Sequence, residues 1–147
     1  MKPPLAPYAG SEPVILRRGA VAVIERFGRL LVIRRAEGIA APGAFCFPGG
    51  GIEPGESEAA ALVRELQEEL GVEVEPIRRH WRSVTPWGVE LFWWLATLPE
   101  EIEPAANPAE VADVYWHTPA EMAALDGLLE SNRQFLAAVA SREIALG

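Results

Sequence analysis

Runs of aliphatic and aromatic residues alternate along this chain with short segments rich in glycine and proline. Apolar runs of roughly four to eight residues that are bounded by turn residues predict β-strands. The expected strands cover a short edge segment at residues 14–18, a hairpin formed by residues 20–24 and 30–34 with its turn at 27–29, a short segment at 45–47, and residues 72–83, 89–98 and 114–117. The intervening segments 38–43, 48–55 and 99–108 are expected to be loops.

One segment in the middle of the chain has the features of an amphipathic helix. Ser57 is a good N-cap and Gly71 a good C-terminal stop for a helix between them. With successive residues about 100° apart around the axis, its apolar residues fall on one side, which we expect to face the core. These residues are Ala59, Leu62, Val63, Leu66 and Leu70. Two further helices are expected over residues 119–125, after Thr118 as N-cap, and over residues 132–141.

The order of these elements indicates an α/β fold. Strands come first, a helix follows, and further strands and helices complete the chain, which predicts a mixed β-sheet with helices packed on its faces. The chain has 147 residues, half of them hydrophobic, and this is the size and composition of one globular domain. We expect a proline-rich, mobile arm over residues 1–13 and a single domain over residues 14–147.

The predicted central helix also carries a cluster of acidic residues. Glu65, Glu68 and Glu69 fall within an arc of roughly 100°, and Arg64 flanks them one turn before Glu68. Like charges this close repel one another, and a bound cation would relieve the repulsion. Mg²⁺ is the natural candidate because it takes oxygen ligands and bridges carboxylates to phosphates. The alternative is a solvated acidic face with an Arg64–Glu68 ion pair.

The overall charge narrows the choice of partner. A net charge of −8 argues against a nucleic-acid backbone or an anionic membrane surface, and a phosphate-bearing substrate would need metal ions or local arginines to approach. No apolar run has the length of a signal-peptide core or a membrane span, so we expect a cytoplasmic protein. Cys46 is the only cysteine, which excludes an internal disulfide and indicates a small buried residue.

Residues 50–72, GGIEPGESEAAALVRELQEELGV, resemble the Nudix box, Gly-x5-Glu-x7-Arg-Glu-U-x-Glu-Glu-x-Gly-U, in which U is a bulky apolar residue. Every defined position of the box matches, and agreement over so many fixed positions is far more specific than a lone glycine motif. A weaker resemblance to the family extends from about residue 19 to residue 136. The matching box positions are Gly50, Glu56, Arg64, Glu65, Leu66, Glu68, Glu69, Gly71 and Val72.

The resemblance implies the α/β/α sandwich of Nudix proteins, with a mixed sheet and helices on both faces. It also implies Mg²⁺-dependent hydrolysis of a nucleoside diphosphate linked to another group, with Mn²⁺ able to substitute. Glu68 and Glu69 match the positions that bind metal most consistently, and Glu65 matches a position that binds metal or serves as general base. A carbonyl at Gly50, or at its neighbour Gly49, would add a further metal ligand.

The same resemblance assigns supporting roles. Arg64 would orient a glutamate, and Glu56 would support the cluster or contact a metal-bound water, so Glu65, Glu56 and Arg64 are the expected catalytic residues. Some members of the family supply another acidic ligand from a loop beyond the box. Glu110 and Asp113 are the candidates here, with a plain surface position as the alternative for Glu110.

Residues outside the box must select the substrate, and we expect Arg34, Trp87 and Asn132 to bind it. Asn132 lies where a MutT-type asparagine reads an oxidised guanine, and an amide can donate and accept hydrogen bonds at once. The alternative is that Asn132 caps the last helix. Trp87 stands beside Pro86 in a predicted turn, where its ring could stack on a base.

These features favour a MutT-like enzyme that cleaves a nucleoside triphosphate, including an oxidised form, to the monophosphate and pyrophosphate. ADP-ribose or another nucleotide sugar is the alternative substrate class, supported by Pro86 at a spacing that such members often show. A catalytically silent Nudix-fold module that senses a nucleotide or binds a protein is the alternative of another class, and the complete box argues against it. The expected partner is a small nucleotide, with monomer and homodimer both open.

Overall fold

The structure is a computed structural model that describes residue 15 and residues 17–143. The expected arm at residues 1–13 lies outside these described residues. The strands are β1 (Arg17–Val23), β2 (Glu25–Arg26), β3 (Arg29–Arg35), β4 (Phe45–Cys46), β5 (Gly49–Gly51), β6 (Glu75–Val84), β7 (Val89–Thr97) and β8 (Val111–His117). The helices are α1 (Glu58–Leu70), α2 (Pro119–Ala123) and α3 (Glu130–Ala140).

The strands form two hydrogen-bonded sheets. In the first sheet the order is β5-β1-β7-β6, and β1 runs parallel to β7 while the other pairs are antiparallel. In the second sheet β3 pairs with β2, β4 and β8, all antiparallel. The mixed pairing that the order of elements predicts is therefore confirmed.

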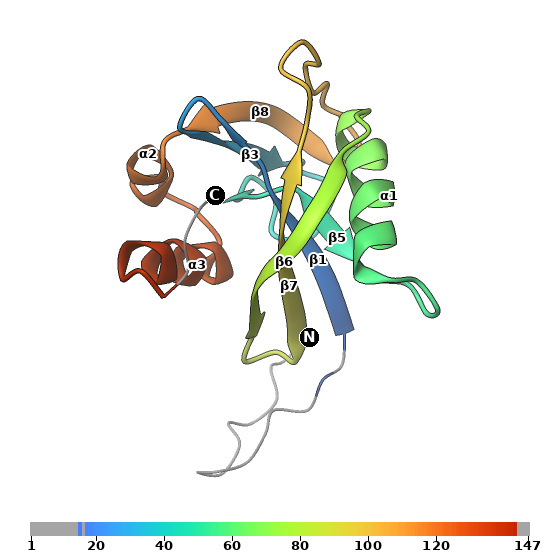
Figure 1. Cartoon of the computed structure of the whole chain (residues 1–147), viewed down its shortest axis with the longest axis vertical. Helices are drawn as coiled ribbons and strands as arrows, with labels where there is room; N and C mark the ends of the chain where they lie inside the picture. The colour runs from blue at the N-terminus through green and yellow to red at the C-terminus, as the bar shows by residue number, and fades with distance from the viewer. Residues whose placement is uncertain (1–14, 16, 144–147) are drawn as a thin grey trace.

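Helices cover both sides of these strands. Figure 1 shows α1 on one side and α2 and α3 on the other, with the strands between them. Successive side chains of a strand point to opposite faces, and β3 accordingly supplies Leu31 and Ile33 to a core under α1, and Leu30 and Val32 to a second core under α2 and α3. The predicted α/β/α sandwich is confirmed.

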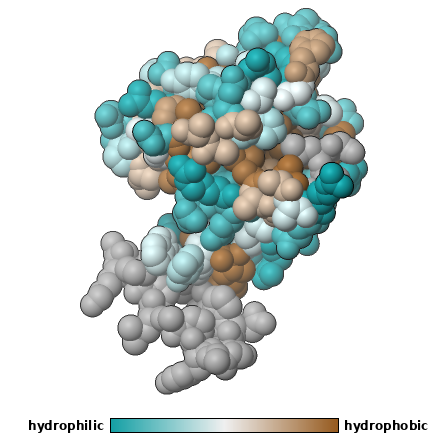
Figure 2. Space-filling view, turned by 90° about the vertical axis from the view of Figure 1, so that its left-hand side faces the viewer, coloured by the Kyte–Doolittle hydropathy of each residue, from teal (hydrophilic) through white to brown (hydrophobic). Residues whose placement is uncertain are grey.

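The surface on the α2–α3 side mixes polar and apolar residues. Figure 2 views the molecule from this side and shows hydrophobic residues concentrated in the middle of the face, among hydrophilic ones. No helix within the described residues is long and apolar enough to cross a membrane.

The predicted hairpin of residues 20–24 and 30–34 is wrong. β1 pairs with β5 and β7, and the hairpin that does form joins β2 to β3 through a turn at Phe27 and Gly28. These two residues have φ values of 52° and 77°, as in a type I′ turn, whose twist suits a tight hairpin. The chain passes from one sheet to the other at Ile24, whose carbonyl accepts a hydrogen bond from the Leu31 N–H at 3.0 Å. The predicted edge strand at residues 14–18 is also wrong in its described part, because Arg17 and Arg18 open β1, which lies between β5 and β7.

The glycine segment expected to be a loop contains a strand. Gly49 to Gly51 pair with β1 in antiparallel register, Gly49 opposite Val21 and Gly51 opposite Gly19. Gly49 has a φ of 151°, and a Cβ atom there would overlap the carbonyl oxygen of Ala20. Only glycine permits this close approach, so the residues that predict a flexible turn instead build an edge strand.

The ends of the helices follow the sequence closely. Ser57 Oγ accepts a hydrogen bond from the Ala60 N–H at 3.1 Å, and Gly71 ends α1 with a φ of 63°. Thr118 caps α2 through a capping box with Glu121. The last helix begins at Glu130, two residues before its predicted start, and its N-cap is Leu129. Asn132 therefore lies inside the first turn, and the alternative that it caps the helix is wrong.

The contact between β1 and β5 generates a stability prediction. Gly49→Ala should lower the free energy of unfolding by about 1–3 kcal/mol or more, because the new methyl group meets backbone atoms that cannot rotate away. Gly51→Ala is the matched control, since a Cβ atom there has no neighbour within 4 Å. Chemical denaturation of both variants measures the difference, and equal stability would show that the close approach does not constrain the fold.

Candidate active site

Helix α1 directs acidic side chains toward β5. Glu69 is only 5% exposed, and its Oε1 accepts a hydrogen bond from the Gly49 N–H at 2.9 Å. Burial raises the pKa of this carboxyl to about 8, and repulsion from Glu65 and Glu110 adds to the rise. An ionised Glu69 thus lies in a place that disfavours its charge, where a cation would stabilise it.

Glu65 lies one turn earlier on α1, directly against Gly50. A Cβ atom at Gly50 would collide with the Glu65 carboxylate, so the glycine leaves the space that this carboxylate occupies. Burial raises the pKa of Glu65, and Glu68 and Glu110 raise it further, while Arg64 opposes them. Gly50 is therefore needed at this position for two reasons: it permits the backbone turn, and it leaves room for the Glu65 carboxylate.

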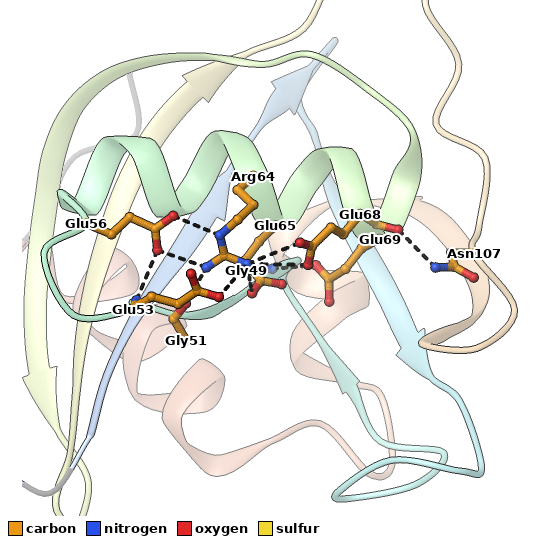
Figure 3. A network of polar contacts seen from close by, with 9 residues as sticks. All are labelled: Gly49, Gly51, Glu53, Glu56, Arg64, Glu65, Glu68, Glu69 and Asn107. Atoms are coloured by element: carbon orange, nitrogen blue, oxygen red, sulfur yellow. Dashed lines mark hydrogen bonds and ion pairs between the residues drawn. The ribbon is translucent and has the colours of Figure 1, made fainter.

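Arg64 connects the helix to the loop that precedes it (Figure 3). Its Nε and Nη2 donate to the two carboxylate oxygens of Glu56 at 2.8 and 2.9 Å, a bidentate pair. Nη2 also donates to the Gly51 carbonyl at 2.8 Å, and Nη1 donates to Glu65 Oε1 at 2.9 Å. These hydrogen bonds hold the pKa of Glu56 down at about 2. One guanidinium thus fixes the β5–α1 loop against the helix.

Glu68 lies at the solvent-facing side of the cluster. Its side chain is 48% exposed, and both its oxygens are 3.4 Å from Arg64 Nη1, in the expected i,i+4 relation. An exposed pair at this distance contributes little to stability, so Glu68 is held loosely compared with Glu65 and Glu69.

Of the two acidic candidates outside the box, Glu110 faces the cluster. Its charge acts on both Glu65 and Glu69, and its carbonyl is fixed by the Ala36 N–H at 3.1 Å. Asp113 lies on β8 opposite Arg34 and interacts with Tyr115. The structure therefore brings Glu110, rather than Asp113, to the acids of α1.

The chemistry of this cluster fits a divalent cation. Its donors are carboxylate and carbonyl oxygens, which Mg²⁺ and Mn²⁺ prefer. Burial, and after it the neighbouring acids, raise the pKa values of Glu65 and Glu69, and a bound cation would offset both effects. Over residues 15 and 17–143, the acidic side chains are not already gathered into a finished cage of three or more ligands. Arg64 holds Glu65 and Glu68, and the Gly49 N–H holds Glu69, so binding would require these side chains to exchange partners.

A cleft of about 260 Å³ opens beside the glycine strand. Its wall includes Asn132, which is 4% exposed. The Asn132 Oδ1 accepts a hydrogen bond from the Phe47 N–H at 2.9 Å, and Nδ2 donates to Ser131 Oγ at 3.2 Å. The lining residues are Arg17, Arg18, Gly19, Ala20, Val21, Arg35, Cys46, Phe47, Gly49, Gly50, Gly51, Val89, Leu91, Leu129, Ser131 and Asn132.

Arg34 and Trp87 are not among these lining residues. The Arg34 guanidinium lies over the Phe45 ring at 5.9 Å, and its Nε donates to the Gly43 carbonyl at 3.4 Å. Trp87 is 50% exposed in the turn between β6 and β7. Neither residue therefore forms part of the cleft wall, although each has a near neighbour in the sequence, Arg35 and Val89, that does.

Sequence reasoning missed the arginines of the cleft. Arg35 follows Arg34 directly, and a β-bulge lies between them where β3 pairs with β8. Arg17 opens β1 and lines the cleft, but it lies outside the box and in no motif. The alternation of β3 offers a signal for choosing between the two adjacent arginines: Arg35 shares the face of Leu31 and Ile33, which pack under α1, whereas Arg34 shares the face of Leu30 and Val32.

Comparison with known proteins places the chain in a family. The family model described as NUDIX domain matches residues 15–139. Among curated proteins, a CTP pyrophosphohydrolase of Escherichia coli K12 is 42% identical over 76 residues, which are 50% of this chain and 56% of that protein. An 8-oxo-dGTP diphosphatase of Haemophilus influenzae is 36% identical over 58 residues, 40% of this chain and 43% of that protein. The chain thus spans about half the length of the curated relatives it matches.

Solved structures agree on the fold. The MutT protein from Methanosarcina mazei Go1 superposes with a TM-score of 0.73 at 19% identity, over 90% of this chain and 99% of that one. The ORF135 protein of Escherichia coli gives a TM-score of 0.62 at 28% identity, over 93% of this chain and 98% of that one. Because the family model matches most of the chain and its characteristic motif is complete, this protein belongs to the NUDIX domain family.

Proposed function

We propose that this protein is a Mg²⁺-dependent pyrophosphohydrolase that converts a nucleoside triphosphate, including an oxidised purine form, to the monophosphate and pyrophosphate. One observation carries the proposal. Buried Glu69 and half-buried Glu65 pack against β5, and the same strand lines the cleft whose wall includes Asn132. A site for phosphates and a wall for a base therefore adjoin the same short strand. The curated relatives, a CTP pyrophosphohydrolase and an 8-oxo-dGTP diphosphatase, support this substrate class.

In this proposal Glu65, Glu68 and Glu69 hold the metal, with the Gly50 carbonyl and Glu110 as further oxygen donors. Mg²⁺ when bound neutralises phosphate charge and acidifies the attacking water. Arg64 and Glu56 keep the loop and the helix in one arrangement through their bidentate pair. Glu65 is the candidate to accept the proton of the water if it does not itself bind the metal, because its carboxylate lies against Gly50 within the cluster.

The overall reaction is a substitution at phosphorus. The oxygen of water forms a new bond to a phosphorus of the triphosphate chain, and the phosphoanhydride bond to pyrophosphate breaks. One proton leaves the water and passes to the base. Attack at the α-phosphorus expels pyrophosphate and attack at the β-phosphorus expels the nucleoside monophosphate, and both routes give the same two products. The chain's own contribution is to position the phosphates beside Glu65 and Glu69 and to hold the nucleoside in the adjoining cleft.

Asn132 is proposed as the residue that reads the base. Its Oδ1 already accepts from the Phe47 N–H, which fixes the amide and distinguishes its oxygen from its nitrogen. An amide oxygen has a second lone pair and the nitrogen a second hydrogen, so this side chain retains both a donor and an acceptor. Arg35 and Arg17 line the same cleft and could contact substrate oxygens, whereas the cleft geometry gives no support to Arg34 or Trp87.

A nucleotide panel tests the activity. With Mg²⁺ present, we expect nucleoside triphosphates to release pyrophosphate, with the highest kcat/KM on one base or its oxidised form. The released products are separated as phosphate and pyrophosphate and are quantified for each substrate. Faster turnover of ADP-ribose or a nucleotide sugar than of every triphosphate would overturn the substrate choice, and no hydrolysis of any member would favour a silent module.

The metal assignment is tested by Glu68→Gln and Glu69→Gln. Each change removes one negative charge and little volume, and we expect turnover to fall about 10²- to 10³-fold, the usual cost of losing a positioned charge-stabilising group. Glu69→Gln should also stabilise the metal-free protein, because it removes a buried charge, and it should lose most of the rise in melting temperature that Mg²⁺ gives the wild type. Near-native turnover of both variants at saturating Mg²⁺ would contradict the assignment.

The base-reading role is tested by Asn132→Asp. Aspartate keeps an oxygen for the Phe47 N–H but replaces the amide donor, so we expect discrimination among bases to weaken by about 1–3 kcal/mol, which is about 5- to 150-fold in the ratio of kcat/KM values. Asn132→Ala removes both groups and should lower stability as well, because the Phe47 N–H loses its acceptor. The dependence on Mg²⁺ should stay unchanged in both. Unaltered base ratios in Asn132→Asp would exclude the role.

A further inference from the structure

The loop between β7 and β8 is fastened to the C-terminal end of α1 through Asn107. The Asn107 N–H donates to the Glu69 carbonyl at 2.9 Å, and its Nδ2 donates to the Glu68 carbonyl at 3.1 Å. Figure 3 shows the second of these bonds at the end of the acidic network. The last carbonyls of a helix have no partner within the helix. Asn107 therefore provides hydrogen-bond donors for the carbonyls of Glu68, the exposed acid of the cluster, and Glu69, the buried one.

The same residue also fixes Glu110. The Asn107 carbonyl accepts hydrogen bonds from the Glu110 N–H at 2.9 Å and the Val111 N–H at 2.8 Å, and Oδ1 accepts from the Ala109 N–H at 3.2 Å. Pro108 follows Asn107, which suits the second position of a type I turn. Glu110 is thus separated by one tight turn from the residue that holds the end of α1.

This connection opposes a repulsion. Like charges at close range repel one another, and the turn that begins at Asn107 carries Glu110 toward the end of α1 that bears Glu68 and Glu69. Asn107 supplies those contacts through backbone and side chain at once, on the helix side and on the turn side. The loop therefore stays beside the acids when no cation draws them together.

We propose that Asn107 is a positioning residue for the cation site, which sets the spacing between Glu110 and the glutamates of α1. The inference rests on the metal-dependent function proposed above. Asn107 lies outside the Nudix box and acts through other residues rather than on the substrate. Its role is to hold Glu110, on the loop between β7 and β8, at a fixed distance from the end of α1. A cation could then bind with little rearrangement of the backbone.

A neutral amide suits this position for a physical reason. The Nδ2 group meets a carbonyl at the negative end of the helix dipole, where a hydrogen-bond donor is favourable and a carboxylate is not. Asn107→Asp keeps the size and the Oδ1 acceptor but removes the donor and adds a charge beside the cluster. Asn107→Ala removes both side-chain hydrogen bonds without adding a charge.

These two variants are compared with the wild type and with Thr118→Ala. The control loses the N-cap of α2, on the other side of the sheets from α1. Two midpoints are measured: the Mg²⁺ concentration that gives half of the rise in melting temperature, and the Mg²⁺ concentration that gives half-maximal hydrolysis. We expect both Asn107 variants to need roughly 10- to 100-fold more Mg²⁺ at each midpoint, as for other residues that orient metal ligands, with KM for nucleotide at saturating Mg²⁺ little changed.

Thr118→Ala should lower the melting temperature of the metal-free protein and keep the wild-type Mg²⁺ midpoints. If the Asn107 variants behave in the same way, Asn107 only stabilises the fold and the inference is overturned. If Asn107→Asp does not fold, the midpoints of Asn107→Ala decide. A wild-type protein whose melting temperature does not respond to Mg²⁺, with or without nucleotide, would overturn the proposed function itself, so the two failures are distinguishable.

Discussion

The burial of Glu69 against the backbone of β5 is the interaction on which the rest of the site depends. A carboxylate removed from water costs free energy unless it is paired, and among the described residues the Gly49 N–H is the donor that reaches Glu69. That bond requires the helix to lie close to the strand, which Gly49 and Gly50 permit because they have no side chains. The fully buried Leu62, Leu66 and Leu70 hold the helix there, so favourable apolar packing offsets an unfavourable charge.

The positive charge next to this cluster serves mainly to fix geometry. Arg64 directs two of its nitrogens to Glu56 and one of these also to the Gly51 carbonyl, which leaves Glu69 without a contacting guanidinium among its hydrogen bonds. The amide of Asn107 does similar work at the other end of the helix without adding charge. Arg64 also contacts Glu65 and Glu68 and neutralises part of their charge, so Glu69 is the box acid on which a divalent cation would have the larger effect.

Local patterns predicted what local interactions determine. The helix, its Ser57 cap and its Gly71 stop follow from residues within a few positions of one another, and the structure confirms them. The partners of β1 are set by contacts distant in sequence, so a hairpin with the next strand looked equally good from the pattern alone. The cleft is also non-local, because its wall joins β1 to the start of α3. The alternation of β3 separates Arg35 from Arg34, but the sequence alone does not say which of the two faces lines the cleft.

The hydrogen bond between Asn132 and Phe47 joins two parts of the site that have different tasks. Phe47 precedes Gly49 by two residues and packs edge-on against Phe135, one turn beyond Asn132 on α3. The wall proposed to face the nucleoside is thus connected directly to the segment that leads into β5, the strand against which the acids of α1 pack. Under the proposed function, a shift of α3 that accommodated a different base would also displace Phe47 and the adjoining strand β5. New specificity would more readily arise from side chains on the opposite wall, such as Arg17 or Val89.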